Sequence, residues 1–341
     1  MVQSRSWPRA ARRLAALALA CVGLAAAGCG STTTAATGGK TTPGTAAVAY
    51  PAPLGHLNEG TIGTAFANTS GQTYTGIAAP PGGLDDEITS GKISPNVLET
   101  ITDDDMLPLM PTLTKWYIRY AETSLVLAYS PASKYAGQFK AIARHKLPVR
   151  DLFTIMEKPG FRLGRTDPNI DPQGRDLIYM LELAQTKFDL PAGAVQKILH
   201  GPLASASSPQ IRPAAALFTQ LRSGQFDAVG IYQFQAFEMH LPYVTLPAEV
   251  DLGIASLAHH YSTAKLTIAG HVVTHGAPLV LDITTLGSTD QAAADAFVKF
   301  VLSPGGLLLH KQLGFTLLAP TPYGNRNAVP SVIRNELSTG S

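Results

Sequence analysis

Short apolar runs alternate along this chain with amphipathic stretches whose apolar residues have the spacing of a helix. This alternation limits the possible fold classes more than any other feature of the sequence. Uninterrupted apolar runs of strand length predict buried strands, whereas apolar residues spaced three and four apart predict helices packed on one side. The strands are predicted at 124–129, 226–232 and 279–283, and helices at 176–188 and 289–302. Strands that alternate with helices indicate an α/β fold with largely parallel sheets.

Length and composition agree with such a fold. The chain has 341 residues, of which 45% are hydrophobic and 15% charged, so it contains enough apolar material for a buried core. Because domains usually comprise roughly 100–200 residues, two lobes are expected. No apolar run of about 18 residues follows the first thirty positions, so no membrane-spanning segment is predicted in the mature chain.

The N-terminus has the pattern of an export signal. Arg12 and Arg13 precede an apolar stretch at 14–24, and small residues at 25–28 lead into Cys29. This order is typical of a secretory signal peptide, and small residues directly before a cysteine resemble a bacterial lipoprotein signal. We therefore expect Cys29 to carry a lipid that anchors the protein to the cell membrane on its extracytoplasmic side. The alternative is an ordinary signal peptide with an incidental cysteine.

Charge and cysteine content exclude several functions. The formal net charge is 26 − 24 = +2, and removal of the four arginines in the leader gives 22 − 24 = −2. A chain so close to neutral is a poor candidate for binding nucleic acid. Cys21 lies inside the leader, so Cys29 is the one thiol of the mature chain. An internal disulfide or a thiolate metal cluster is therefore not expected.

Two strands are predicted to carry the chain between the lobes, at 124–129 and near 265–269. The resulting division is a signal peptide at 1–29, a Thr/Gly/Ala-rich tether at 30–46, lobe 1 at 47–123 and 265–341, and lobe 2 at 124–264.

The stretch from Gly164 to Arg175 contains two Asp-Pro pairs. A carboxylate before proline can cap a helix, because proline fits the first helical turn. Asp171 is therefore predicted to cap a helix that begins at Pro172, and Asp167 to fix an Asx-turn. In the alternative interpretation, the amides at that helix start, together with Asp171, face a ligand in a cleft. Physical arguments alone favour the structural role.

This stretch, with the Leu-Glu-Leu-Ala that follows at 181–184, resembles a segment of the molybdate/tungstate-binding proteins of ABC importers, in particular their tungstate-type branch. Further matches follow in the same order along the chain, at 116–117, 128–135, 246–247, 276–279 and 300–306. The resemblance extends from about residue 47 to residue 318. It implies a two-lobed periplasmic-binding-protein fold of type II, with two hinge crossovers and a cleft that closes over an oxyanion. It also implies a monomeric receptor that is not an enzyme, needs no cofactor or metal and delivers its solute to an ABC permease.

The resemblance and the hydrogen-bonding groups expected at the cleft give a set of candidate ligand-binding residues. These are Tyr50, Gly82, Gly83, Arg165, Asp167, Asn169, Asp171, Gly174 and Tyr232. Core packing is the alternative role for the two tyrosines. Arg165 and Arg175 could instead pair with the nearby aspartates at 167, 171 and 176.

Three family ligand positions are changed in this chain. Pro53 stands where the family has a serine hydroxyl and an N–H, Pro81 or Gly82 where it has a second serine, and Ile231 where it has a glutamate before a tyrosine. Proline cannot donate a hydrogen bond, so these changes should weaken oxyanion binding. Two alternatives are therefore a receptor retuned to a different small polar solute and a scaffold lipoprotein that binds no solute.

An enzyme is the remaining class. The sequence has no Gly-x-Ser-x-Gly motif, and no predicted helix carries a His-x-x-x-His zinc pair. His259 and His260 are neighbours that would not share a helix face, and the acidic run at 103–105 is typical of a solvated turn. We therefore expect a binding protein.

Overall fold

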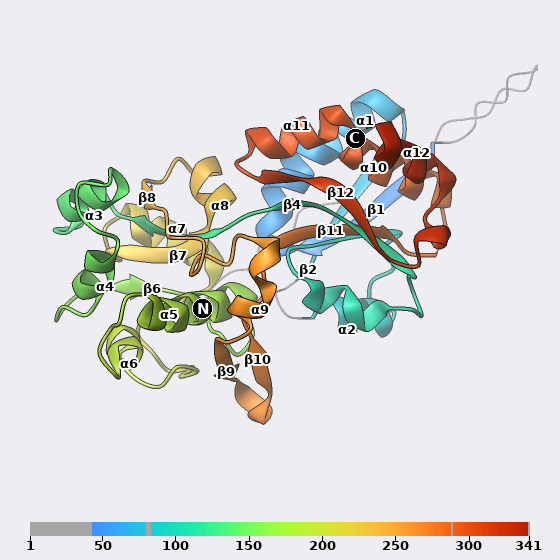
Figure 1. The fold of residues 1–341 in the computed structure, drawn as a ribbon. Helices are drawn as coiled ribbons and strands as arrows, with labels where there is room; N and C mark the ends of the chain where they lie inside the picture. Colours follow the sequence, from blue (N-terminus) through green and yellow to red (C-terminus); the bar gives the residue numbers. More distant parts are fainter. Residues whose placement is uncertain (1–42, 80–82, 288, 340–341) are drawn as a thin grey trace, which may run out of the picture. The chain divides into compact units, whose positions relative to one another are not determined.

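The computed structural model describes residues 43–79, 83–287 and 289–339. Most of their strands belong to two sheets (Figure 1). The six-stranded sheet has the order β12 (Thr316–Gly324), β4 (Trp116–Glu122), β11 (Val280–Thr285), β3 (Val97–Thr100), β1 (Thr45–Pro51) and β2 (Thr73–Ala79). The four-stranded sheet has the order β6 (Leu163–Gly164), β7 (Ala228–Tyr232), β5 (Leu125–Tyr129) and β8 (Tyr243–Val244). A hairpin of β9 (Lys265–Thr267) and β10 (Val273–His275) forms a third, small sheet.

Helices fill the connections between the strands, as an α/β fold requires. Those that follow β1 or come after β11 are α1 (Gly63–Ser70), α2 (Leu84–Thr89), α10 (Gln291–Leu302), α11 (Pro304–Gln312) and α12 (Ser331–Thr339). Those between β5 and β9 are α3 (Ala136–Ala143), α4 (Arg150–Met156), α5 (Pro172–Lys187), α6 (Ala194–Leu199), α7 (Ala214–Arg222), α8 (Gln233–Glu238) and α9 (Ala258–Tyr261). The predicted α/β class is confirmed.

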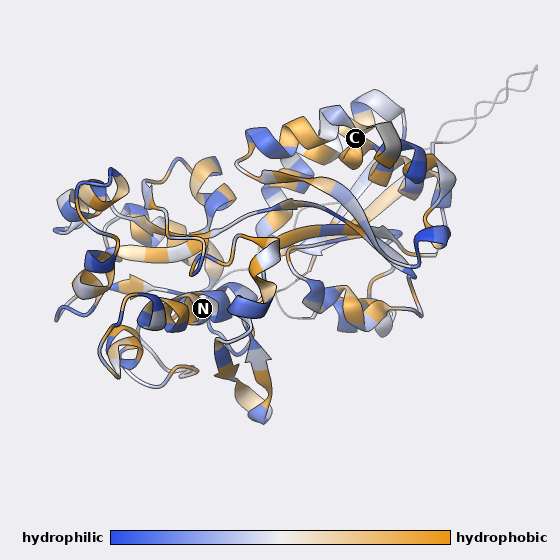
Figure 2. Cartoon of the chain, in the orientation of Figure 1, coloured by the Kyte–Doolittle hydropathy of each residue, from blue (hydrophilic) through white to orange (hydrophobic). Residues whose placement is uncertain are grey.

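Both large sheets are covered on their two faces. In β1, Val48 and Tyr50 belong to the cluster that includes α10, whereas Ala49 belongs to a second cluster with residues of α2. In β5, Leu127 and Val126 divide in the same way between two clusters. Successive side chains of a strand point to opposite faces, so these strands carry apolar residues on both faces. Figure 2 shows this hydrophobic colouring along β11, with hydrophilic residues on the outer helices.

The prediction of largely parallel sheets is wrong. In the two large sheets three pairs are parallel (β1–β2, β1–β3 and β6–β7), and five are antiparallel (β3–β11, β4–β11, β4–β12, β5–β7 and β5–β8). The cause is topological. β4 leads out of the six-stranded sheet into β5, and β11 leads back into it, so the two neighbours run in opposite directions.

The segments that join the two sheets lie beside each other. The Thr123 N–H, just before β5, donates to the carbonyl of Leu279, just before β11, at 3.0 Å. The strand expected near 265–269 is present as β9, but it pairs with β10, and the chain enters the six-stranded sheet only at Val280. Within the part of the chain that the structure describes, no single helix is long and apolar enough to cross a membrane; the bent pair α10–α11 passes that test by length and composition.

Candidate functional site

A cavity of about 290 Å3 lies where the turn after β1 faces three helices of the four-stranded sheet. The turn is a 3-10 segment, η1 (Ala52–Leu54), followed by a π-helical stretch, η2 (His56–Ile62), and by α1. The helices are α5, α7 and α8. The cavity is lined by Ala52, Pro53, His56, Asp171, Gln173, Ala214, Ala215, Phe218, Gln235, Glu238 and Met239.

Asp171 is the N-cap of α5 and lies at this cavity. Its side chain accepts a hydrogen bond from the Gln173 N–H at 3.0 Å, and its carbonyl accepts from the N–H groups of Gly174 and Arg175. Pro172 has no N–H, so the first-turn amides of α5 are already satisfied within the helix. Burial raises the pKa of the Asp171 carboxyl, while the hydrogen bond from the Gln173 N–H opposes the rise. The predicted cap is confirmed.

Asp167 and Asn169 tie the loop before α5 together. The Asp167 carboxylate accepts from both the N–H and the side-chain amide of Asn169, at 2.9 and 2.8 Å, which is the predicted Asx-turn. The Asn169 amide also donates to the carbonyl of Ala204, and its oxygen accepts from the N–H of Ala269 in the β9–β10 turn. The polar atoms of Asn169 are thus engaged with the protein itself.

Gly174 and Arg165 fix how α5 sits against that loop. A Cβ on Gly174 would lie 2.7 Å from the Thr166 carbonyl oxygen, so this close approach requires glycine. Arg165 is 1% exposed, and its Nε donates to the side chain of Gln210 at 3.2 Å. Burial lowers the pKa of its guanidinium. Neither residue lines the cavity.

The two candidate tyrosines are buried, and their hydroxyls are engaged away from the cavity. The Tyr232 hydroxyl donates to Asp176 at 2.8 Å, and that of Tyr50 donates to Glu59. Burial is the main cause that raises the pKa of both phenols. A ligand role for either hydroxyl therefore requires that an internal hydrogen bond break.

Of the remaining positions, Gly83 and Ile231 are described by the structure, and neither lines the cavity. Gly83 precedes α2, and no described residue of α2 lines the cavity. Gly82, Pro81 and Cys29 lie outside the described residues. Ile231 is buried in the core behind α7 and α8.

The alternative metal candidates are engaged with the protein. The Nε2 of His260 lies 2.7 Å from the carbonyl of Glu249, and Asp103 pairs with Arg119. No group of three His, Cys, Asp or Glu side chains suited to a metal occurs among the described residues.

Glu238 and His56 are cavity residues that the sequence analysis did not identify. Glu238 follows Gln235 by three positions on α8, and His56 follows Pro53 by three positions in the helical run after β1. Residues three apart share a helix face, so the spacing was an available signal. The Glu238 Oε1 is buried without a hydrogen-bond partner, and burial raises the pKa of this carboxyl to about 7.

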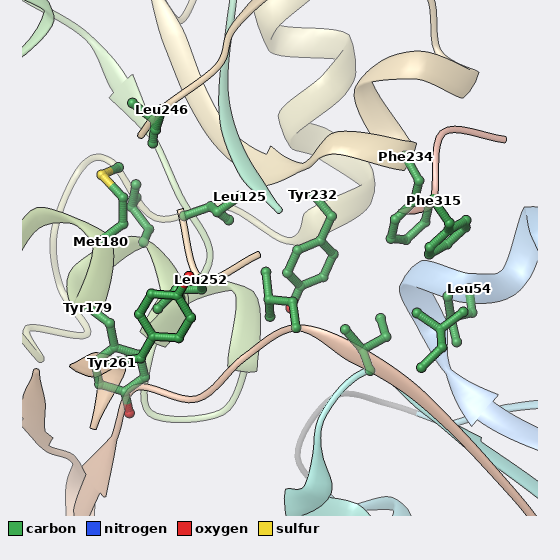
Figure 3. Close-up of a cluster of buried hydrophobic side chains, with 14 of the residues drawn as sticks. Leu54, Leu125, Tyr179, Met180, Tyr232, Phe234, Leu246, Leu252, Tyr261 and Phe315 are labelled. Carbon is green, nitrogen blue, oxygen red and sulfur yellow. The ribbon is translucent and has the colours of Figure 1, made fainter. Parts of the chain in front are cut away.

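A buried aromatic cluster contains residues that are adjacent in sequence to cavity residues. Phe234 of α8 stacks on Phe315, with ring centroids 4.7 Å apart, and Tyr232 stacks on Phe234 at 5.9 Å. Figure 3 shows these rings together with Leu54, the residue after Pro53, which is in the same buried cluster. This packing holds η1 and α8, from different sheets, against a common core.

Solved structures confirm the fold. The chain is similar to the periplasmic molybdate-binding protein of Azotobacter vinelandii, with a TM-score of 0.53 and 16% identity over 80% of this chain and 99% of that one. It is also similar to iron-bound HitA of Pseudomonas aeruginosa, with a TM-score of 0.50 and 16% identity over 85% and 89%. The architecture is that of a two-lobed periplasmic binding protein.

The sequence comparison defines the family. Residues 47–316 match the model of the bacterial extracellular solute-binding proteins, so the chain belongs to this family. An uncharacterized solute-binding protein of Petrotoga mobilis is 27% identical over 241 residues, which are 68% of this chain and 71% of that protein. The molybdate/tungstate-binding protein WtpA of Thermococcus kodakarensis is 28% identical over 245 residues, 66% of each chain. The predicted family and fold are confirmed.

Proposed function

We propose that the protein is the solute-binding subunit of an ABC importer, which captures a small solute in the cavity at Asp171 and delivers it to the permease. The observation that carries this proposal is the family match, because residues 47–316 include every described residue that lines the cavity and every strand of the two large sheets except β12 and the first residues of β1. A Haloferax volcanii relative, 30% identical over 213 residues, is provisionally named an ABC transporter molybdenum-binding protein.

Capture is proposed to occur by closure of two lobes, 47–123 with 265–341 and 124–264. The adjacent crossings at Thr123 and Leu279 support a hinge there, because a few residues at element ends can absorb such a rotation. The Cys29 lipid is proposed to hold the receptor at the cell membrane. Incorporation of labelled palmitate, lost in Cys29→Ser, tests this anchoring.

An oxyanion of the molybdate/tungstate class is the first candidate ligand. Its support is that the Thermococcus kodakarensis and Pyrococcus abyssi relatives are both molybdate/tungstate-binding proteins. Calorimetry of the purified chain with tungstate, molybdate and sulfate tests it. Retained family specificity predicts tight binding of tungstate, and no heat with any of the three would exclude this ligand class.

A different small polar solute is the second candidate, favoured by the lining of the cavity. The first-turn amides of α5 are satisfied internally, Pro53 cannot donate, and Asp171 and Glu238 bring carboxyl groups to the site. A scaffold lipoprotein that binds no solute is the remaining alternative. Ligand-dependent uptake by cells that carry the cognate importer separates the receptor from a scaffold.

A further inference from the structure

We infer that the cavity binds a small organic ammonium ion, whose N–H groups face the carboxyl groups of Asp171 and Glu238 and whose carbon skeleton packs on Phe218 and Met239. This inference rests on the proposed receptor function and specifies the ligand class for its second candidate. It follows from the charges, the hydrogen-bonding capacity and the size of the cavity.

The charged groups at the cavity are unsuited to an anion. Asp171, Glu238 and His56 are its ionisable lining residues, and no lysine or arginine is among the described residues that line it. Arg222, on α7, turns its guanidinium to the carbonyl of Met239 at 2.7 Å. An anion in this cavity would meet carboxyl groups where partial burial strengthens repulsion, whereas a cation would be attracted.

Most of the hydrogen-bonding side chains of the cavity offer acceptors; Gln235 is the exception, because its Oε1 accepts from the Tyr232 N–H at 3.2 Å and leaves its amide N–H group to donate. The Glu238 Oε1 is buried and has no partner, although a buried polar atom is normally satisfied. Gln173 is 3% exposed, and its side-chain N–H group donates to the Gly230 carbonyl at 3.1 Å, so its carbonyl oxygen is the part left to accept. An ammonium group has three donors and no acceptor, which complements this set.

The size and the apolar lining indicate an organic ligand. A volume of about 290 Å3 is close to the lower limit for small-molecule pockets, which is roughly 300 Å3. Phe218, Met239, Pro53 and three alanines offer apolar contact along much of the wall. Since the described residues contain no cluster of three ligands for a metal ion, a bare metal cation fits the site less well.

Calorimetry on the full chain at pH 7.5 tests the inference, with propylamine and 1,4-diaminobutane as ammonium probes. Propanol and tetramethylammonium are the controls, because the first lacks the charge and the second lacks the N–H groups. We expect at least one amine to bind, and to bind at least about tenfold more tightly than either control, since a hydrogen bond to a charged partner is worth roughly a factor of ten or more. Binding of tungstate but of neither amine would overturn the inference and leave the receptor function standing. Absence of any amine binding overturns it as well.

Two variants localise the amine. Glu238→Gln removes the charge while it keeps the shape, and we expect an affinity at least about tenfold lower. Asp171→Asn keeps a helix-capping oxygen and should also weaken binding. Asp86→Asn, an exposed carboxylate on α2 outside the cavity, is the matched control and should bind as the wild type does. Equal losses in Glu238→Gln and Asp86→Asn would contradict the site, and circular dichroism confirms that each variant is folded.

Discussion

The cavity lies between the N-terminus of α5 and the turn after β1, and these two walls differ in how their backbone N–H groups are used. At α5, Asp171 supplies a carboxylate that accepts from the Gln173 N–H, so the helix carries its own anion. At the turn after β1, Pro51 precedes η1 without any side-chain cap, and Pro53 has no N–H to offer. At α5 the backbone N–H donors are therefore satisfied within the helix, whereas the turn after β1 lacks one such donor at Pro53.

The carboxylate cap at α5 and the missing N–H at Pro53 would each weaken the attraction of a helix N-terminus for an external anion. Both occur in a chain whose relatives include two molybdate/tungstate-binding proteins, so the proposed change of ligand would separate fold from ligand preference in this family. Substitutions at each wall can measure how much each feature contributes to stability and to ligand binding.

The largest effect is expected at Gly174, which lets α5 approach its preceding loop. An alanine there would put a Cβ 2.7 Å from the Thr166 carbonyl oxygen and 3.0 Å from the Pro168 nitrogen. Both are backbone atoms, so Gly174→Ala should destabilise the fold by about 1–3 kcal/mol, measured by urea unfolding.

Gly55→Ala is the matched control on the opposite wall. Gly55 has helical dihedral angles, and a Cβ there would contact nothing within 4 Å. Its replacement should be neutral or stabilise by up to about 1 kcal/mol, because alanine has the higher helix propensity. If Gly174→Ala is stabilising as well, the close approach of α5 to its loop is not a constraint.

The Asp171 cap is expected to give the next largest effect. Asp171→Ala removes the acceptor of the Gln173 N–H and should cost about 1 kcal/mol of unfolding free energy. Asp171→Asn keeps an oxygen in the same place and should cost distinctly less. A loss in the asparagine variant as large as in the alanine variant would show that the charge, rather than the hydrogen bond, stabilises α5.

The sequence predicted those features that depend on neighbouring residues. The Asp171 cap and the Asx-turn of Asp167 follow from the Asp-Pro pairs, and β5 follows from its apolar run. The direction of β11 did not follow, because it depends on how the chain returns between the sheets.

The candidate site was less predictable because its chemistry depends on distant partners. Tyr232 donates to Asp176, which is 56 positions away, and no local pattern indicates that its hydroxyl is already engaged. The buried Oε1 of Glu238 has no hydrogen-bond partner, and only the packing of α8 reveals this. The position of Glu238 was more predictable, because its spacing from Gln235 places both residues on one helix face.

The Pro53 wall is expected to give a smaller effect, on binding rather than stability. Pro53→Ser restores both an N–H and a hydroxyl, and Pro53→Ala restores the N–H alone. One net hydrogen bond is worth about 1 kcal/mol, so the serine variant should bind tungstate roughly fivefold more tightly than the wild type, with alanine in between. Calorimetry measures both. Identical tungstate affinities in all three proteins would show that Pro53 does not limit oxyanion binding.

The smallest effect is expected from titration of Glu238. Burial raises the pKa of its carboxyl to about 7, above the usual value of 4.5, so between these values the folded state holds a proton that the unfolded state has lost. A raised carboxyl pKa therefore makes the unliganded protein more stable as the pH falls from 8 to 6. Glu238→Gln cannot titrate, and its melting temperature should change less than that of the wild type over this range. Asp251, whose pKa burial raises to about 6, contributes in the same direction in both proteins, so the difference between them isolates Glu238.

An ammonium ligand favours the ionised carboxylate of Glu238 and should reduce the pH dependence of the melting temperature of the wild type, whereas an oxyanion ligand should increase it. The same measurement, repeated with 1,4-diaminobutane and with tungstate, thus reports which charge the cavity accepts.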